Sequence, residues 1–147
     1  MADSMEREIL TYPLDRDQIQ RELDFVIEHF QQEGIESCKI LFGFAWGNEY
    51  YPGNHWPYEE IPLESLAEKV REVEANCDGA LGQDDLFVEV AGLKFEFCHE
   101  SDIHIYFEEE PGPEIEFFYS CWKRLGYRPA EWLKNQKIGP GERLRFD

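Results

Sequence analysis

Basic side chains are scarce in this sequence. Its 147 residues include 14 lysines and arginines against 32 aspartates and glutamates, and the net charge is −18. A negative field of this strength repels phosphate backbones and anionic lipid, and it attracts cations and basic proteins. We therefore expect a basic protein partner and neither a nucleic-acid nor a membrane partner. Solubility alone, or adaptation to high salt, is the competing explanation for the acidity.

Long apolar runs are missing as well. The longest, ILFGFAWG at 40–47, is far too short to cross a bilayer. The opening residues MADSMEREIL lack the basic stretch followed by an apolar stretch that marks a signal peptide. These features predict a cytoplasmic protein.

Cysteines are few, and recognisable chemical motifs are absent. No two cysteines form a C-x-x-C pair, and a chain of this length folds without disulfides. The sequence contains no G-x-G-x-x-G, Walker, G-x-S-x-G, H-E-x-x-H or EF-hand pattern. We predict no cofactor and no metal site, and we favour a protein that is not an enzyme. Buried free thiols are expected at Cys38, Cys77, Cys98 and Cys121.

Aromatic residues, in contrast, are abundant. They make up 15% of the chain, and hydrophobic residues make up 42%, which is typical of a folded protein. The length fits one domain spanning 1–147. Residues 1–120 contain 7 basic and 29 acidic side chains, whereas 121–147 contain 7 basic and 3 acidic ones. The last segment, 138–147, is predicted to be a loosely packed basic tail.

Three stretches have the apolar spacing of helices, at 15–33, 62–75 and 113–125. The first has Asp15 as N-cap, with Gln18 three residues later, as in a capping box. The third has acidic residues in its first turn and basic residues in its last turn, as the helix dipole favours.

Alternation with a period of two predicts strands. One strand is expected at 38–46, and three more form a meander over 85–108. With Ala91 and Gly92 as a two-residue turn, Val88 faces Phe95. With a three-residue loop over 100–102, Phe97 faces Ile105, and the apolar faces of all three strands agree.

The order of these elements, α-β-α-β-β-β-α, indicates an α+β fold with helices packed on one face of a mainly antiparallel sheet. The strand at 38–46 is expected at an edge of the meander or parallel to one of its strands. The segment 47–62 is predicted to be a loop, and 129–135 an extra helical turn.

The predicted register places Asp85, Cys98 and His104 in one row on the sheet face away from the core. A thiol beside a base that a carboxylate orients is the general form of an activated nucleophile. An ordinary mixed polar face is the alternative, and it is favoured. Because adjacent strand residues point to opposite faces, Cys98 and His99 are not expected to bind one metal ion together.

The loop at 47–62 has the composition of a binding surface, because rigid aromatic residues with polar tips recur as interface hot spots. A lid of aromatic residues folded over the edge of the core explains it equally well. Acidic residues border the loop, and three further glutamates end the meander. The candidate partner-binding residues are Tyr50, Tyr51, His55, Trp56, Tyr58, Glu59, Glu60, Glu108, Glu109 and Glu110.

Two functions compete on these observations. The first is a small acidic interaction module that binds and neutralises a basic partner, as immunity proteins, antitoxins and inhibitors do. The second is an enzyme or a small-ligand-binding domain that uses the face with Asp85, Cys98 and His104 or the aromatic loop. We prefer the first because the charge is the strongest signal in the sequence.

Overall fold

Among the described residues, seven antiparallel strands form one sheet, in the order β3-β2-β4-β5-β6-β1-β7. The structure is a computed structural model that describes residues 7–43, 45–51, 53, 55–107 and 112–133. The strands are β1 (Arg7–Leu10), β2 (Ser37–Phe42), β3 (Glu59–Pro62), β4 (Leu86–Val90), β5 (Leu93–Phe97), β6 (Ile103–Phe107) and β7 (Ala130–Leu133).

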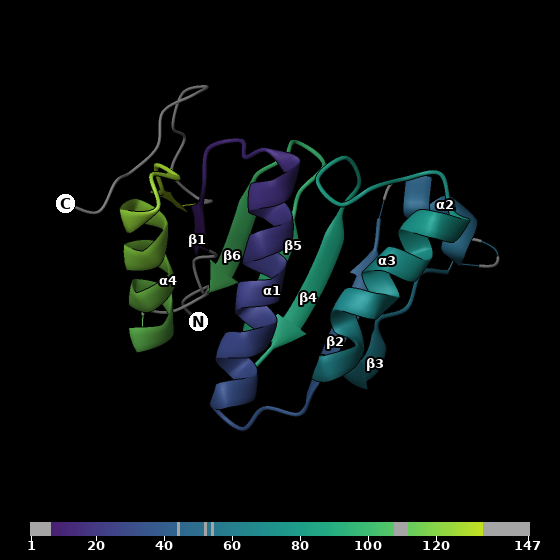
Figure 1. Cartoon of the computed structure of the whole chain (residues 1–147), viewed down its shortest axis with the longest axis horizontal. Helices are drawn as coiled ribbons and strands as arrows, with labels where there is room; N and C mark the ends of the chain where they lie inside the picture. Colours follow the sequence, from purple (N-terminus) through teal and green to yellow (C-terminus); the bar gives the residue numbers. More distant parts are fainter. Residues whose placement is uncertain (1–6, 44, 52, 54, 108–111, 134–147) are drawn as a thin grey trace, which may run out of the picture.

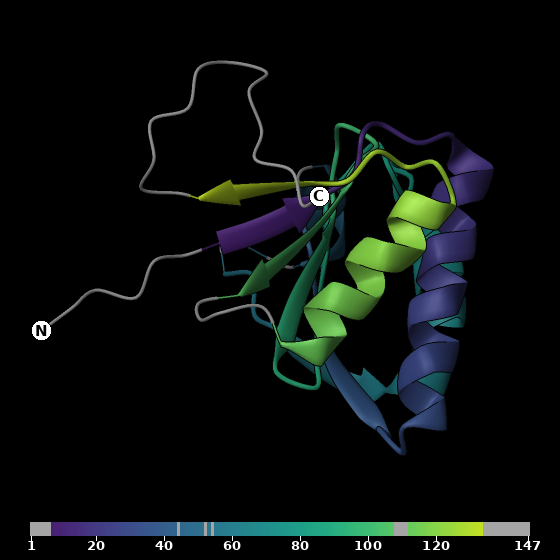
Figure 2. The same cartoon turned by 90° about the vertical axis from the view of Figure 1, so that its left-hand side faces the viewer.

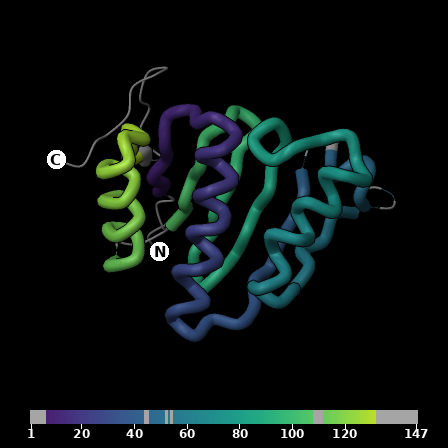
Figure 3. The backbone as a smooth tube through the Cα atoms, viewed as in Figure 1, coloured from purple at the N-terminus to yellow at the C-terminus, as the bar shows by residue number. Residues whose placement is uncertain are grey.

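Helices cover one face of this sheet (Figure 1). They are α1 (Arg16–Gln32), α2 (Ala45–Tyr50), α3 (Leu66–Asn76) and α4 (Pro113–Arg124), with a 3-10 turn, η1 (Leu63–Ser65), before α3. Figure 2 shows α1 and α4 on the same side of the sheet. Figure 3 shows α1 across the middle of the sheet, with α3 toward its β3 edge. The predicted α+β class is confirmed, and we call the face without helices, within the described residues, the open face.

None of the described helices is long and apolar enough to cross a membrane.

Helix α1 begins and ends as its sequence predicts. The Asp15 carboxylate accepts a hydrogen bond from the Gln18 backbone N–H at 2.8 Å, and the Gln18 side chain accepts one from the Asp15 N–H at 2.9 Å. This capping box satisfies two donors that the helix itself leaves open. Gly34, with φ of 84°, follows the last turn in the left-handed conformation that glycine adopts without strain.

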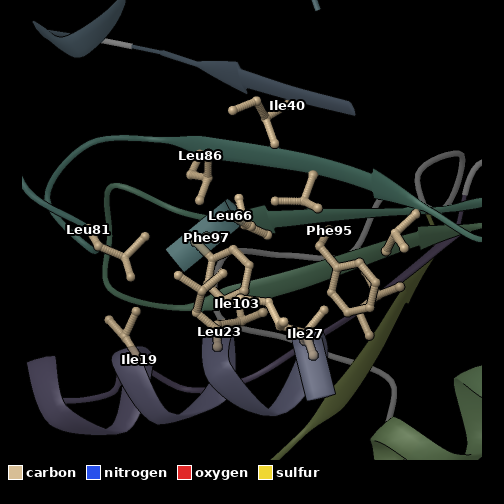
Figure 4. Packing of buried hydrophobic residues seen from close by; sticks show 14 of the residues in the cluster. Ile19, Leu23, Ile27, Ile40, Leu66, Leu81, Leu86, Phe95, Phe97 and Ile103 are labelled. Atoms are coloured by element: carbon tan, nitrogen blue, oxygen red, sulfur yellow. The ribbon is translucent and has the colours of Figure 1, made fainter. Parts of the chain in front are cut away.

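The core lies between the sheet and the helices (Figure 4). Ile19, Leu23 and Ile27 point from α1 toward Phe95 and Phe97 of β5. These side chains are at most 8% exposed, so α1 buries one continuous apolar stripe against the centre of the sheet.

Helix α1 also buries one carboxylate. Glu22 is 4% exposed and accepts a hydrogen bond from Trp122 Nε1 of α4 at 2.8 Å. Burial raises the pKa of this carboxyl above its ordinary value of 4.5, and the hydrogen bond from Trp122 opposes that rise in part. Since the unfolded chain ionises first as the pH rises above 4.5, ionisation of Glu22 lowers the stability of the folded state.

Replacing Glu22 with glutamine is therefore expected to raise the free energy of unfolding at neutral pH, because the amide oxygen still accepts from Trp122 and carries no charge. The gain should vanish as the pH falls below 4.5, where both states of the wild type are protonated. Urea denaturation at several pH values measures this. Glu28→Gln on the exposed side of α1 is the control, and a gain independent of pH would contradict the explanation.

The meander confirms one predicted register and corrects the other. Ala91 and Gly92, with φ of 52° and 80°, form the two-residue turn, and Val88 faces Phe95 as predicted. In the next hairpin Phe97 faces Ile103, not Ile105. The turn is displaced by one residue toward the N-terminus, because the Cys98 N–H donates to the Asp102 carbonyl at 2.8 Å and closes a three-residue loop over 99–101 instead of 100–102. A shift of two residues leaves every side chain on its predicted face.

The predicted elements occur in the predicted order, and three strands and one helix are added to them. Strand β2 pairs with β4 at the edge of the meander, one of the two predicted positions. It ends at Phe42, and the chain from Ala45 forms α2 where a strand end and a loop were predicted. The predicted helical turn at 129–135 is wrong, because β7 pairs there with β1. The predicted tail, 138–147, lies outside the described residues.

Candidate functional site

Polar side chains gather on the open face where β5 turns into β6. The members of this group lie on β1, β5 and β6, just before β4, and in the turn just after β5. Its buried members include Asp85, Glu96, Cys98 and Asp102, none more than 9% exposed. We call it the acid–histidine cluster; its members are Glu8, Asp85, Glu96, Cys98, His99, Asp102 and His104.

His104 lies between two carboxylates. Its Nδ1 is 2.7 Å from Glu8 Oε1, and its Nε2 is 3.1 Å from Asp102 Oδ1. Burial lowers the pKa of this imidazole, but contacts with Asp102, Cys98 and Glu8 outweigh burial and raise the pKa to about 12. The ring is therefore an imidazolium at neutral pH, held by an acid on each side.

Cys98 lies beside His104 and is protonated. Burial is the main cause that raises the pKa of its thiol, and the hydrogen-bonding contact with His104 only partly opposes it. A nucleophilic cysteine needs a lowered pKa, so this arrangement lacks the thiolate that the enzymatic hypothesis requires.

The structure brings Asp85, Cys98 and His104 into one cluster, but the predicted row is wrong. Glu96, not Cys98, faces His104 across the β5–β6 pair. Asp85 contacts His99 instead. The Asp85 Oδ1 atom accepts a hydrogen bond from the His99 backbone N–H at 2.8 Å, and it lies 3.0 Å from Nδ1 of the His99 ring.

The expected separation of Cys98 and His99 is also wrong. Strand β5 ends at Phe97, so neither residue belongs to a regular strand, and alternation of faces does not apply. The Cys98 Sγ is 3.6 Å from Nδ1 of His99. The donor atoms of Asp85, Cys98 and His99 all lie within 4.8 Å of one another.

Toward β4, the open face becomes aromatic. The Tyr106 hydroxyl donates to Glu96 Oε1 at 2.5 Å, and burial raises the pKa of both groups. Lys94 Nζ lies 5.2 Å from the ring centre of Phe87 and 6.0 Å from that of Tyr106. These cation–π contacts partly neutralise the face.

Tyrosine side chains of the predicted loop belong to the fold. The Tyr51 hydroxyl accepts from the Phe42 N–H at 2.9 Å, and this side chain is 6% exposed. The Tyr50 hydroxyl donates to Glu59 Oε1 at 2.8 Å, and Lys69 Nζ lies 4.9 Å from the Tyr50 ring centre. Tyr50 therefore ties α2 to β3 and α3, and Tyr51, just after α2, ties this segment to β2.

The other aromatic residues of this segment are more accessible. Trp56 is half-buried and stacks on Tyr51 at 6.1 Å between ring centres. His55 is exposed, and Tyr58 is 36% exposed. Burial and the nearby Glu89 of β4 raise the pKa of Tyr58 to about 12.

The predicted acidic border is only partly described. The Glu59 carboxylate accepts a hydrogen bond from the Tyr50 hydroxyl and lies 3.9 Å from Lys69 Nζ. Glu60 is exposed and accepts a hydrogen bond from the Ser37 hydroxyl at 3.2 Å. Glu108, Glu109 and Glu110 lie outside the described residues.

A regular row of acids begins at Glu64. Glu64, Glu68 and Glu72 follow at intervals of four residues from η1 along α3, and all three are exposed. We call them the glutamate row. Among the described residues, no ion pair involves any member of the row. Sequence analysis missed the row because only the apolar stripe of this helix was considered.

No protein-family model, curated protein or solved structure matches this chain. The function is therefore inferred from the chemistry of its surfaces.

Proposed function

We propose that the chain is an acidic interaction module that binds a basic protein through the glutamate row. The observation that carries the proposal is the spacing of three exposed carboxylates without an ion-pair partner among the described residues. Such a row is complementary to a surface rich in arginine and lysine.

The row has a cost for the isolated protein. Like charges four residues apart on a helix destabilise it by about 0.2 to 0.5 kcal/mol per pair. Glu64, Glu68 and Glu72 form two such pairs on η1 and α3. Lys69 of α3 is turned toward Tyr50 and Glu59, and its charge also acts on Glu72 at longer range. A bound basic partner would remove this repulsion.

The surface next to the row supports the same proposal. Strand β3 is the edge of the sheet, and His55 and Tyr58, both accessible, precede it directly. An aromatic residue next to carboxylates suits arginine, whose guanidinium stacks on a ring and pairs with an acid. This combines the accessible part of the predicted aromatic loop with the acids of α3.

A double charge reversal tests the proposal. Glu68→Lys/Glu72→Lys is expected to weaken binding of a synthetic peptide rich in arginine and lysine by at least about tenfold, or ~1.4 kcal/mol. The wild-type affinity should fall steeply between low and moderate salt, because screening weakens exposed charges. Fluorescence anisotropy of the labelled peptide, measured at two salt concentrations, gives both results.

The matched control is Asp24→Lys/Glu28→Lys on the exposed side of α1, also four residues apart. It changes the net charge by the same amount. Equal weakening by the two variants would show that only net charge matters and would contradict a site on α3. A wild-type affinity for the peptide that does not change with salt concentration would contradict the electrostatic basis of the proposal.

A further inference from the structure

Three side chains of the acid–histidine cluster present a thiol, a carboxylate and an imidazole to one point. The donor atoms of Cys98, Asp102 and His104 all lie within 4.8 Å of one another. Cys98 and Asp102 are each 5% exposed, and the His104 side chain is 13% exposed. They converge because Cys98 and Asp102 are joined across the turn between β5 and β6, and His104 follows on β6.

The spacing agrees with a tetrahedral ion. Bonds of about 2.1 Å from zinc to nitrogen and oxygen place these two atoms ~3.4 Å apart, and a zinc–sulfur bond of about 2.3 Å places sulfur ~3.6 Å from either. Nε2 of His104 is 3.1 Å from Asp102 Oδ1. Small adjustments of the side chains would therefore place all three donors at bonding distance.

A fourth residue orients the imidazole. Glu8 of β1 lies 2.7 Å from Nδ1 of His104, so Nε2 is the nitrogen left to face Asp102. A histidine that binds metal through one nitrogen commonly donates its other N–H to a carboxylate, which fixes the ring and makes it a stronger ligand. Glu8 is 96 residues away in sequence, and the pairing of β1 with β6 brings it here.

We propose that Cys98, Asp102 and His104 bind one zinc ion or a similar transition-metal ion, with Glu8 as the residue that positions His104. Thiolate and imidazole ligands select such ions over calcium and magnesium, which prefer oxygen. Three protein ligands leave the fourth tetrahedral position for water or another ligand. On binding, Cys98 releases its thiol proton and His104 releases the proton on Nε2, so two protons leave as one divalent ion enters.

Cobalt substitution tests this site. The full chain, freed of metal by a chelator, is titrated with Co²⁺ alone. We expect one Co²⁺ per chain and a sulfur-to-cobalt charge-transfer band, which Zn²⁺ should remove by displacing the cobalt. Cys98→Ser should abolish the band, whereas Cys121→Ser, a buried thiol of α4, should retain it. Glu8→Gln should keep the band while the affinity falls by about 10- to 100-fold.

Several outcomes would overturn the proposal. One is the absence of a charge-transfer band in the wild type at equimolar Co²⁺. Another is a band that remains in Cys98→Ser. A band lost in His99→Gln but kept in His104→Gln would assign the ion to the neighbouring group of Asp85, Cys98 and His99 instead. Circular dichroism establishes that each variant folds. Asp102→Asn is a second ligand variant, and it keeps the thiol. An unchanged cobalt affinity in Asp102→Asn would also contradict the site.

Discussion

Replacing Phe95 with alanine is expected to lower the free energy of unfolding by about 3 to 5 kcal/mol. Phe95 is fully buried at the centre of the sheet. Its ring packs edge-to-face against Phe30 of α1 at 6.1 Å and against Phe118 of α4 at 5.3 Å. The substitution would remove a ring that joins these two helices to β5 and leave a cavity that packed neighbours fill only in part.

Urea denaturation measures this loss, and Phe117→Ala is the matched control. Phe117 is 38% exposed and stacks on Phe25 and His29 at the surface between α1 and α4. Its truncation should lower stability by about 1 to 2 kcal/mol, the contribution of these two aromatic pairs. Similar losses in the two variants would contradict a core centred on β5.

Replacing Arg7 with methionine is also expected to lower the free energy of unfolding by about 3 to 5 kcal/mol. The guanidinium donates through Nε, at 2.6 Å, and through Nη2 to the Glu131 carboxylate. Glu131 is 7% exposed, so loss of Arg7 would leave a buried charge without its principal partner. Methionine retains apolar contact with Phe107, over which Arg7 lies at 5.1 Å.

A double-mutant cycle separates this pairing from the other contacts of Arg7. Arg7→Met/Glu131→Leu should recover most of the stability, since replacing both members of a buried pair by apolar residues is often neutral. Arg16→Met is the control, because that side chain is 70% exposed and its pair with Glu74 is worth under about 1 kcal/mol. A double variant as unstable as Arg7→Met would show that lost packing, not the buried charge, is the cause.

The two proposals concern different parts of the molecule. The glutamate row lies on η1 and α3, near the β3 edge, and the acid–histidine cluster lies between β1 and β5 on the open face. Peptide binding that responds to Glu68→Lys/Glu72→Lys and cobalt binding that responds to Cys98→Ser are therefore independent measurements. The protonated Cys98 argues against the nucleophile of the enzymatic hypothesis, but it leaves a metal ligand, because an ion displaces the proton.

Sequence patterns that involve only neighbouring residues correctly predicted several helices and strands. The capping box at Asp15 and the apolar stripe of α1 identify that helix, and the turn at Ala91 and Gly92 gives the register of β4 with β5. These features depend on neighbours in sequence, so they can be read without the fold. The same is true of the free thiols, all four of which are unpaired in the structure.

Other elements were missed because their partners are distant. Strands β1 and β7 are four residues each and pair with each other, and β1 also pairs with β6, across most of the chain. Four residues are too few for alternation to distinguish a strand from a loop. The register of β5 with β6 was misjudged by two residues, since the closure of the turn depends on a backbone hydrogen bond from Cys98 to Asp102.

The sequence by itself determined the class of fold, the position of the principal helices and the excess of negative charge, because periodicity, capping and composition are local or additive properties. Only the tertiary structure decided which charges meet. Glu8 reaches His104, and Arg7 reaches Glu131, through strand pairings that close over about a hundred residues, and no local pattern encodes such a distance. The structure likewise decided that Tyr50 and Tyr51 support the fold while the glutamate row remains exposed to solvent, because burial depends on what packs on each side chain.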